Sequence, residues 1–340
     1  MPDGDSRHGL RPVESVARAA RTDGPVKAFC IDFNWGPSGV APPGMYAHAD
    51  PAEHVRWYHE FGVNVIQTFC VTYNGYAWYP SRVAPITPGL RAPEFVNDVV
   101  RLGRRVGLRV FGYFCLGSNP WWEQRNPDLV HSDAHGIRIP FTLEYLDYFC
   151  RVVEDALLRT DVEGFMIDWI RPVRRKRWLE AEKRMYAQLM GEAFPTAGEP
   201  PAPALLEFER RAIDRAWRYI RWTVRATRPA IIWTNHPILR EEYPIWEDSR
   251  LLREVDWVLN EAPELEHVAW LRQRVGPQTL IVQNLCGWQG HDAEAWRKLD
   301  LTAVGLYGFA KADEKTTLVD LSVPHNARNV EILRAAYRAI

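Results

Sequence analysis

In the stretch Val162-Glu163-Gly164-Phe165-Met166-Ile167-Asp168-Trp169, a short apolar run follows a glycine and ends in a carboxylate and an indole. The run is too short for a helix, so it predicts a buried strand. A carboxylate at the tip of a buried strand is costly unless it is paired or put to use. In a parallel barrel, active sites are built at strand tips of this kind. Asp168 is therefore the first candidate for a functional residue.

The same pattern of a short apolar run followed by a helical segment recurs along the chain. The predicted strands are 26–32, 63–69, 108–114, 162–168, 230–234, 256–259, 280–283 and 304–307. The predicted helices include 51–60, 93–106, 142–158 and 326–340. This alternation indicates a parallel sheet covered by helices, and eight units predict a closed (β/α)8 barrel of the α/β class. A doubly wound open sheet is the alternative, but no GxGxxG or GxxxxGK[ST] motif follows the first strand.

The barrel is expected to form a single catalytic domain over residues 25–340, after an N-terminal tail of residues 1–24. The long segment 171–229 is predicted to be a helical insertion after the fourth strand, with two helices separated by the prolines between 195 and 203. This insertion is also a candidate interface for a homo-oligomer.

Composition excludes several classes of function. The 340 residues have a formal net charge of −1, which argues against nucleic acid as the main partner. No apolar run of 18 residues occurs, and the first 24 residues lack the apolar core of a signal peptide, so no membrane partner is expected. The five cysteines are widely spaced and form no CxxC pair. They are interpreted as buried thiols of a cytoplasmic protein, not as disulfides or a zinc site.

Polar and aromatic residues lie at or just after the ends of the predicted strands, which a barrel brings to one rim. They are Asp32, Asn34, Trp35, Thr68, Tyr113, Asp168, Trp169, Arg171, Asn235, His236, Asn260, Glu261, Gln283, Asn284, Trp288 and Tyr307. Amides and carboxylates suit sugar hydroxyls, and aromatic rings suit the apolar face of a sugar. Cleavage of a glycosidic bond uses a pair of carboxylates. The rim therefore predicts a carbohydrate ligand.

Each candidate also has a structural interpretation. Asp168 and Asp32 could cap a helix or form a salt bridge, and Glu261 could begin a helix with a favourable dipole contact. His236 could be a loop residue, and the tryptophans could belong to the core. These alternatives stay open at the level of sequence.

Arg171 begins a basic run over residues 171–177. The run is either a solvated face or an anion site for an acidic sugar. Metal chemistry is not expected, because the first strand carries no His-x-His and no HExxH occurs. The GxSxG motif of serine hydrolases is also absent from the sequence.

The stretch Phe165-Met166-Ile167-Asp168-Trp169 resembles the nucleophile strand of glycoside hydrolases related to the family 29 α-L-fucosidases, and more loosely that of the α-galactosidase clan. The stretch from Tyr79-Pro80-Ser81 to Gly112-Tyr113-Phe114-Cys115 also looks like barrel proteins described as fucosidase-like or hypothetical glycoside hydrolases. The resemblance covers roughly residues 26–310. It implies a barrel whose strand-four aspartate is the nucleophile and whose acid/base comes from around strand six. The chain departs from fucosidases after the first strand, where their histidine-and-tryptophan pattern is absent.

The residues and the resemblance together predict a retaining, exo-acting glycosidase without a cofactor. Asp168 is the expected nucleophile, and Glu261 is the expected general acid and base, its pKa raised by partial burial. The residues expected to bind substrate are Asp32, Asn34, Trp35, Tyr113, Trp169, Arg171, Asn235, His236, Asn260, Gln283, Asn284, Trp288 and Tyr307. A glycan-binding barrel without turnover is the second hypothesis, and a metal-dependent hydrolase or isomerase is the third.

Overall fold

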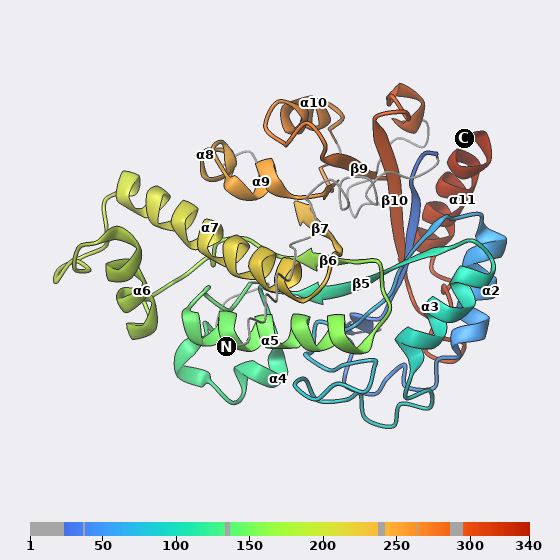
Figure 1. Cartoon of the computed structure of the whole chain (residues 1–340), viewed down its shortest axis with the longest axis horizontal. Coiled ribbons are helices and arrows are strands. Elements are labelled where there is room, and N and C mark those ends of the chain that lie inside the picture. Colours follow the sequence, from blue (N-terminus) through green and yellow to red (C-terminus); the bar gives the residue numbers. More distant parts are fainter. Residues whose placement is uncertain (1–23, 37, 133–136, 237–241, 263, 286–294) are drawn as a thin grey trace, which may run out of the picture.

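The structure is a computed structural model that describes residues 24–36, 38–132, 137–236, 242–262, 264–285 and 295–340. Its centre is a closed barrel of parallel strands, which confirms the predicted (β/α)8 fold (Figure 1). The barrel strands are β1 (Lys27–Asp32), β4 (Val65–Gln67), β5 (Arg109–Cys115), β6 (Gly164–Asp168), β7 (Ile231–His236), β8 (Trp257–Asn260), β9 (Leu280–Asn284) and β10 (Val304–Lys311). Each pairs with its neighbour in chain order, and β10 closes the ring against β1. An open doubly wound sheet is excluded by this closure.

The opening stretch forms β6, the fourth strand of the barrel, and all five of its residues are buried. It lies between β5 and β7, with Tyr113 opposite Met166 and Met166 opposite Trp233. Gly164 starts the strand because a Cβ there would lie 2.3 Å from the carbonyl oxygen of Ile231. The glycine that bounds the apolar run in the sequence is thus a packing requirement of the barrel wall.

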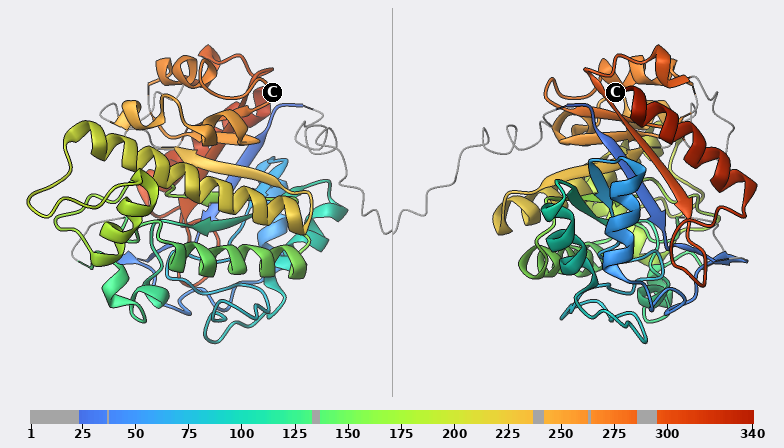
Figure 2. Two further views of the ribbon diagram at one scale, coloured as in Figure 1. Left: turned by 60° about the vertical axis from the view of Figure 1, so that its left-hand side comes forward. Right: turned by 90° about the vertical axis from the view of Figure 1, so that its right-hand side faces the viewer.

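Helices cover the outside of the barrel. They include α2 (Pro51–Phe61), α3 (Phe95–Arg105), α5 (Leu143–Arg159) and α11 (Pro324–Ala339). The predicted start of α2 is confirmed, because the Asp50 side chain accepts a hydrogen bond from the backbone N of Ala52 at 2.7 Å. The helix ends at Gly62, whose φ of 90° favours glycine. Figure 2 shows α11 running beside β10, so the C-terminal helix completes the outer layer.

Two helices follow β6, as the proline-rich break predicts: α6 (Glu180–Met190) and α7 (Ala202–Thr227). In Figures 1 and 2, α7 lies alongside α5. A buried ionic network holds this segment, since Glu182 accepts hydrogen bonds from His131 at 2.7 Å and from Arg175 at 3.1 Å. Arg175 also pairs with Glu209 on α7 at 3.1 Å. Removing one partner of such a network leaves a buried charge unpaired, which typically costs about 3–5 kcal/mol.

Smaller elements complete the fold. A two-stranded sheet of β2 (Trp35–Gly36) and β3 (Gly39–Val40) follows β1, and α4 (Pro120–Glu123) and a 3₁₀ turn (Pro127–Leu129) follow β5. Three short helices lie before and after β8: α8 (Tyr243–Trp246), α9 (Arg250–Glu254) and α10 (Glu266–Arg272). A 3₁₀ turn, Ala295–Lys298, precedes β10. None of the helices in the described ranges is both long and apolar enough to cross a membrane.

Candidate active site

A cavity of about 130 Å³ lies at the carboxyl ends of the barrel strands. The predicted residues that line it are Asp32, Asn34, Trp35, Tyr113, Asp168, Trp169, Asn235, Glu261 and Tyr307. These residues come from β1, β5, β6, β7, β8 and β10 or from the loops just after them. The rim predicted from strand ends is therefore one physical site.

Asp168 is held at the end of β6 by three hydrogen bonds. Its Oδ2 accepts from the hydroxyl of Tyr113 at 2.8 Å. Its Oδ1 accepts from the backbone N of Trp169 at 2.8 Å and from the side-chain amide of Asn235 at 2.9 Å. Burial raises the pKa of Asp168 to about 6, and these donors and the Arg171 charge limit the rise. The carboxyl group is thus ionised at neutral pH and fixed in one orientation.

Glu261 follows β8 directly and is partly exposed at the cavity. Its pKa is raised to about 8, first by burial of the carboxyl group and then by the negative charge of Asp168. The amide of Asn235 donates a hydrogen bond to Asp168 at 2.9 Å and also lowers the pKa of Glu261, so its side chain lies between the two carboxyl groups in the same cavity. The pKa of Glu261 is thus raised more than that of Asp168, so a proton shared by the pair favours Glu261.

Asp32, at the end of β1, adds a third carboxyl group to the cavity. It is 7% exposed, and its Oδ1 accepts a hydrogen bond from the backbone N of Asn34 at 2.8 Å. The pKa of Asp32 is raised to about 7, chiefly by burial and also by the charge of Asp168, while the hydrogen bond from Asn34 and the charge of Lys311 oppose the rise. The carboxyl group of Asp32 is therefore poised near neutral pH.

Aromatic rings form much of the cavity wall. The rings of Trp35 and Tyr73 have centroids 6.1 Å apart, and Tyr73 meets Trp169 edge to face at 5.2 Å. Trp169 has a φ of 60°, a left-handed conformation that a bulky residue rarely adopts. Such strain concentrates at functional sites. The conformation lets the backbone N of Trp169 reach back to the Asp168 carboxylate while its ring lines the cavity.

Some residues predicted to bind substrate lie outside this cavity. The amide of Asn260 donates to Oε1 of Gln283 at 2.7 Å, and Gln283 in turn donates to the carbonyl of Asn284 at 2.8 Å. Asn260, Gln283 and Asn284 are almost fully buried and do not line it. Their hydrogen bonds instead join β8 to β9. Among the predicted residues, the side chain of His236 and the whole of Trp288 lie outside the described residues.

Arg171 is also placed away from the cavity wall. It forms a bidentate salt bridge with Glu242, with Nε 3.2 Å from Oε2. The side chains of this pair are 16% and 12% exposed. Because Glu242 compensates its charge, the anion site considered for an acidic sugar does not form here. Arg171 acts on Asp168 and Glu261 through its field.

The cavity also contains residues that the strand-end pattern missed: Cys30, Gln67, Phe69, Tyr73, Met166 and Phe309. Cys30 and Met166 lie two positions before Asp32 and Asp168, so the period of two in a strand puts them on the same face. The side chains at the bottom of the cavity could have been predicted from this spacing. Gln67 is 1% exposed and its Oε1 has no partner among the described groups. Gln67 could also have been predicted, because it is a polar residue within an otherwise apolar strand.

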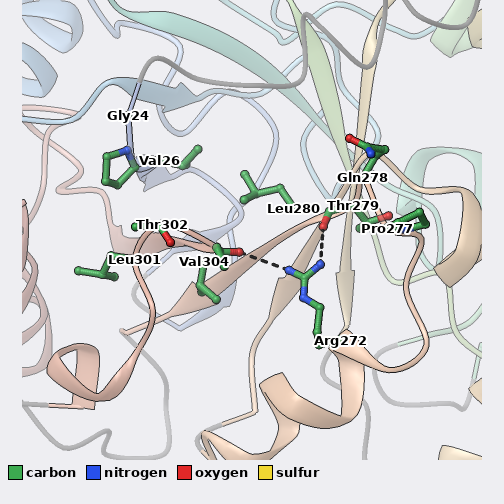
Figure 3. Close-up of a pocket in the computed structure, with 13 residues that line it drawn as sticks. Gly24, Val26, Arg272, Pro277, Gln278, Thr279, Leu280, Leu301, Thr302 and Val304 are labelled. Carbon is green, nitrogen blue, oxygen red and sulfur yellow. Dashed lines mark hydrogen bonds between the residues drawn. The ribbon is translucent and has the colours of Figure 1, made fainter.

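A larger cavity of about 710 Å³ lies at the opposite end of the barrel, beside Val26, Leu280 and Val304 (Figure 3). It is lined by no carboxylate of the described residues. Its cation, Arg272, donates to the carbonyl oxygens of Thr279 at 3.1 Å and Ala303 at 3.3 Å. The amino end of a barrel serves stability rather than chemistry, so this cavity is not the candidate site.

A metal ion has no ready set of ligands here. Within the described ranges, no three His, Cys, Asp or Glu side chains come together in a group able to hold one. The carboxyl groups of Asp32, Asp168 and Glu261 share a cavity but do not form such a set.

The arrangement is a (β/α)8 barrel with acidic and aromatic side chains at the carboxyl ends of its strands. The sequence matches no protein-family model and no curated protein. Among solved structures, it is similar to α-L-fucosidase isoenzyme 2 from Paenibacillus thiaminolyticus, with a TM-score of 0.69 and 14% identity over 93% of this chain and 49% of that one. The chain thus spans about half the length of that structure.

Two further structures share the fold. The PgaB (BpsB) glycoside hydrolase domain from Bordetella bronchiseptica has a TM-score of 0.54 and 16% identity over 90% of this chain and 98% of that one. A GH29 α-L-fucosidase from Bacteroides thetaiotaomicron has a TM-score of 0.51 and 11% identity over 98% and 76%. The chain therefore has the barrel fold of fucosidase-like glycoside hydrolases, which confirms the resemblance at the level of fold.

Proposed function

We propose that this protein is a retaining, exo-acting glycoside hydrolase with Asp168 as the nucleophile and Glu261 as the acid/base. The observation that carries the proposal is the pair of carboxyl groups in one cavity at the carboxyl ends of the strands, with Asp168 held by hydrogen bonds from Tyr113, Trp169 and Asn235. Glycosidases use such a pair, with an ionised carboxylate as nucleophile and a protonated carboxylic acid as proton donor. The fold shared with glycoside hydrolases supports the same assignment.

In the first step, an oxygen of Asp168 attacks the anomeric carbon while Glu261 gives its proton to the departing glycosidic oxygen. A covalent glycosyl-enzyme results, and the aglycone leaves as an alcohol. In the second step, Glu261 takes a proton from water, which attacks the anomeric carbon and releases Asp168. The hydrogen bonds from Tyr113, Trp169 and Asn235 position the nucleophile and keep it ionised.

The size of the cavity supports exo action. At about 130 Å³ it has room for one sugar ring and is closed below by side chains of the barrel interior, including Cys30, Gln67 and Met166. A terminal residue can enter such a pocket, whereas the middle of a glycan chain cannot. Trp35, Tyr73 and Trp169 offer rings to the apolar face of the sugar, and Asp32 accepts hydrogen bonds from its polar groups.

The test is hydrolysis of a panel of aryl glycosides, followed by chemical rescue. Asp168→Gly should lose activity by several orders of magnitude, and added azide should restore turnover and give a glycosyl azide of inverted anomeric configuration. Asp248→Gly is the matched control, because that carboxylate is 78% exposed on the surface. It should retain activity and show no response to azide.

Two results would overturn the proposal. One is full activity in Asp168→Gly. The other is a sugar that binds but is never cleaved, with an affinity unchanged in Asp168→Asn, because that result describes a glycan-binding barrel without turnover.

A further inference from the structure

The described residues that line the cavity include three acids. Asp32, Asp168 and Glu261 line it, and no Lys or Arg of the described chain does so. The two cations that act on these acids do so from outside its lining. Arg171 is already paired with Glu242, and Lys311 ends β10 next to β1. Among the described residues that line the cavity, carboxyl groups are therefore present without a lysine or arginine beside them.

Asp32 is the acid that the retaining mechanism does not require, since that chemistry uses two carboxyl groups. It is 7% exposed and accepts a hydrogen bond through one oxygen, from the backbone N of Asn34. A carboxylate buried in this way is costly unless a cation pairs with it. Burial and the charge of Asp168 raise its pKa, and the backbone N–H of Asn34 and the charge of Lys311, its register partner on β10, offset this rise only in part.

The rest of the wall also suits a cation. Its rings are those of Trp35, Phe69, Tyr73, Tyr113, Trp169, Tyr307 and Phe309. Aromatic faces attract an ammonium group, most strongly when both are shielded from water. An inorganic divalent ion fits less well, because the acids do not form a metal-ligand set within the described ranges.

We propose that the sugar bound in this cavity carries a free amino group, protonated at neutral pH, and that Asp32 is its counter-ion. The inference rests on the proposed function for the ligand being a sugar, but not on its being cleaved. With Glu261 protonated, the bound ammonium compensates one of the two ionised carboxylates, Asp32, and leaves Asp168 free to act as nucleophile. N-acetylation of the amine would remove the charge and the preference with it.

The test is a binding series at pH 7 monitored by tryptophan fluorescence and calorimetry. Glucosamine, galactosamine and mannosamine are each compared with the N-acetylated sugar and with the parent hexose. We expect at least one amino sugar to bind about tenfold or more tightly than both of its partners. In Asp32→Asn this ratio should fall toward one, whereas in the surface control Asp248→Asn it should not change.

A second measurement needs no variant. On lowering the pH to about 5, Asp32 and Asp168 both take up protons while the amine stays charged, so the wild-type preference for the amino sugar should disappear. The inference is overturned if no amino sugar binds more tightly than its partners, or if the preference survives in folded Asp32→Asn.

These outcomes are separate from those of the hydrolase proposal. Asp32-dependent preference for an amino sugar, without cleavage of any aryl glycoside, would sustain the inference and refute the hydrolase. Cleavage of neutral glycosides with equal or weaker binding of amino sugars would do the reverse.

Discussion

Replacing Asp32 by asparagine should make the folded protein more stable at high pH. Asparagine has the shape of aspartic acid but cannot ionise. The folded-state pKa of Asp32, about 7, lies above the ordinary value of 3.8. A raised pKa of this kind means that the stability contributed by the protonated group is fully present below pH ~4 and is lost as the pH rises through about 7.

The size of the effect follows from that pKa. One pKa unit corresponds to about 1.4 kcal/mol, so the ionised Asp32 costs ~4 kcal/mol of folding free energy at pH 8. The unfolding entropy of about 2.1 cal/mol/K per residue gives roughly 0.7 kcal/mol/K for 340 residues. Asp32→Asn should therefore raise the midpoint of thermal unfolding by about 6 °C at pH 8 and by about 1 °C or less at pH 4.

The assay is urea and thermal unfolding of both proteins at pH 4 and pH 8. The matched control is Asp155→Asn, a buried carboxylate that is paired with Arg159 at 2.7 Å and Ser81 at 2.7 Å. Losing those partners should lower stability at pH 8 by about 1–3 kcal/mol. If Asp32→Asn is no more stable than wild type at pH 8, or gains equally at both pH values, Asp32 is not a buried uncompensated charge.

Three further predictions concern the reaction. The profile of kcat/KM against pH should be a bell, falling below about 6, where Asp168 must lose its proton, and above about 8, where Glu261 must keep one. A profile that does not fall on both sides of this window would contradict the assignment. Tyr113→Phe removes a hydrogen bond to the ionised Asp168 that is worth about 1.5–3 kcal/mol. The acidic limb of the profile should therefore move up by roughly one pH unit or more. An unmoved limb would show that Tyr113 does not stabilise the ionised Asp168. Trp169→Gly relieves left-handed backbone strain of order 1 kcal/mol, so the urea midpoint of unfolding should not fall. Loss of the ring should lower kcat/KM about tenfold or more. A loss of stability with unchanged kcat/KM would refute the proposed role of the Trp169 ring in binding the sugar.

The fold could be predicted from sequence because its pattern is local. Each strand is a short apolar run whose boundaries are marked by neighbouring residues, and the run before Asp168 is β6 as predicted. Strand bounds were less accurate where pairing ends early. The run 63–69 is a strand only over Val65–Gln67, the residues that pair in register with both β1 and β5.

The site was only partly predictable because its limits are set by contacts between distant parts of the chain. Asn260 and Gln283 are polar strand-end residues like Asp168, but they lie opposite each other on β8 and β9 and bond together. Arg171 pairs with Glu242, 71 positions later in the chain. Neither pairing can be read from local spacing. What the sequence could provide was the face of each strand that points inward.

The central claim is that Asp168 forms a covalent bond to the sugar, and mass spectrometry can test it most directly. The protein is incubated with the 5-fluoro glycosyl fluoride of the sugar that the aryl glycoside panel identifies. This reagent slows release of the proposed intermediate, and the protein is then digested. The account predicts a single glycosylated peptide containing residues 164–169, with the sugar on Asp168. A sugar on Asp32 or Glu261, or steady turnover with no labelled peptide, would contradict it.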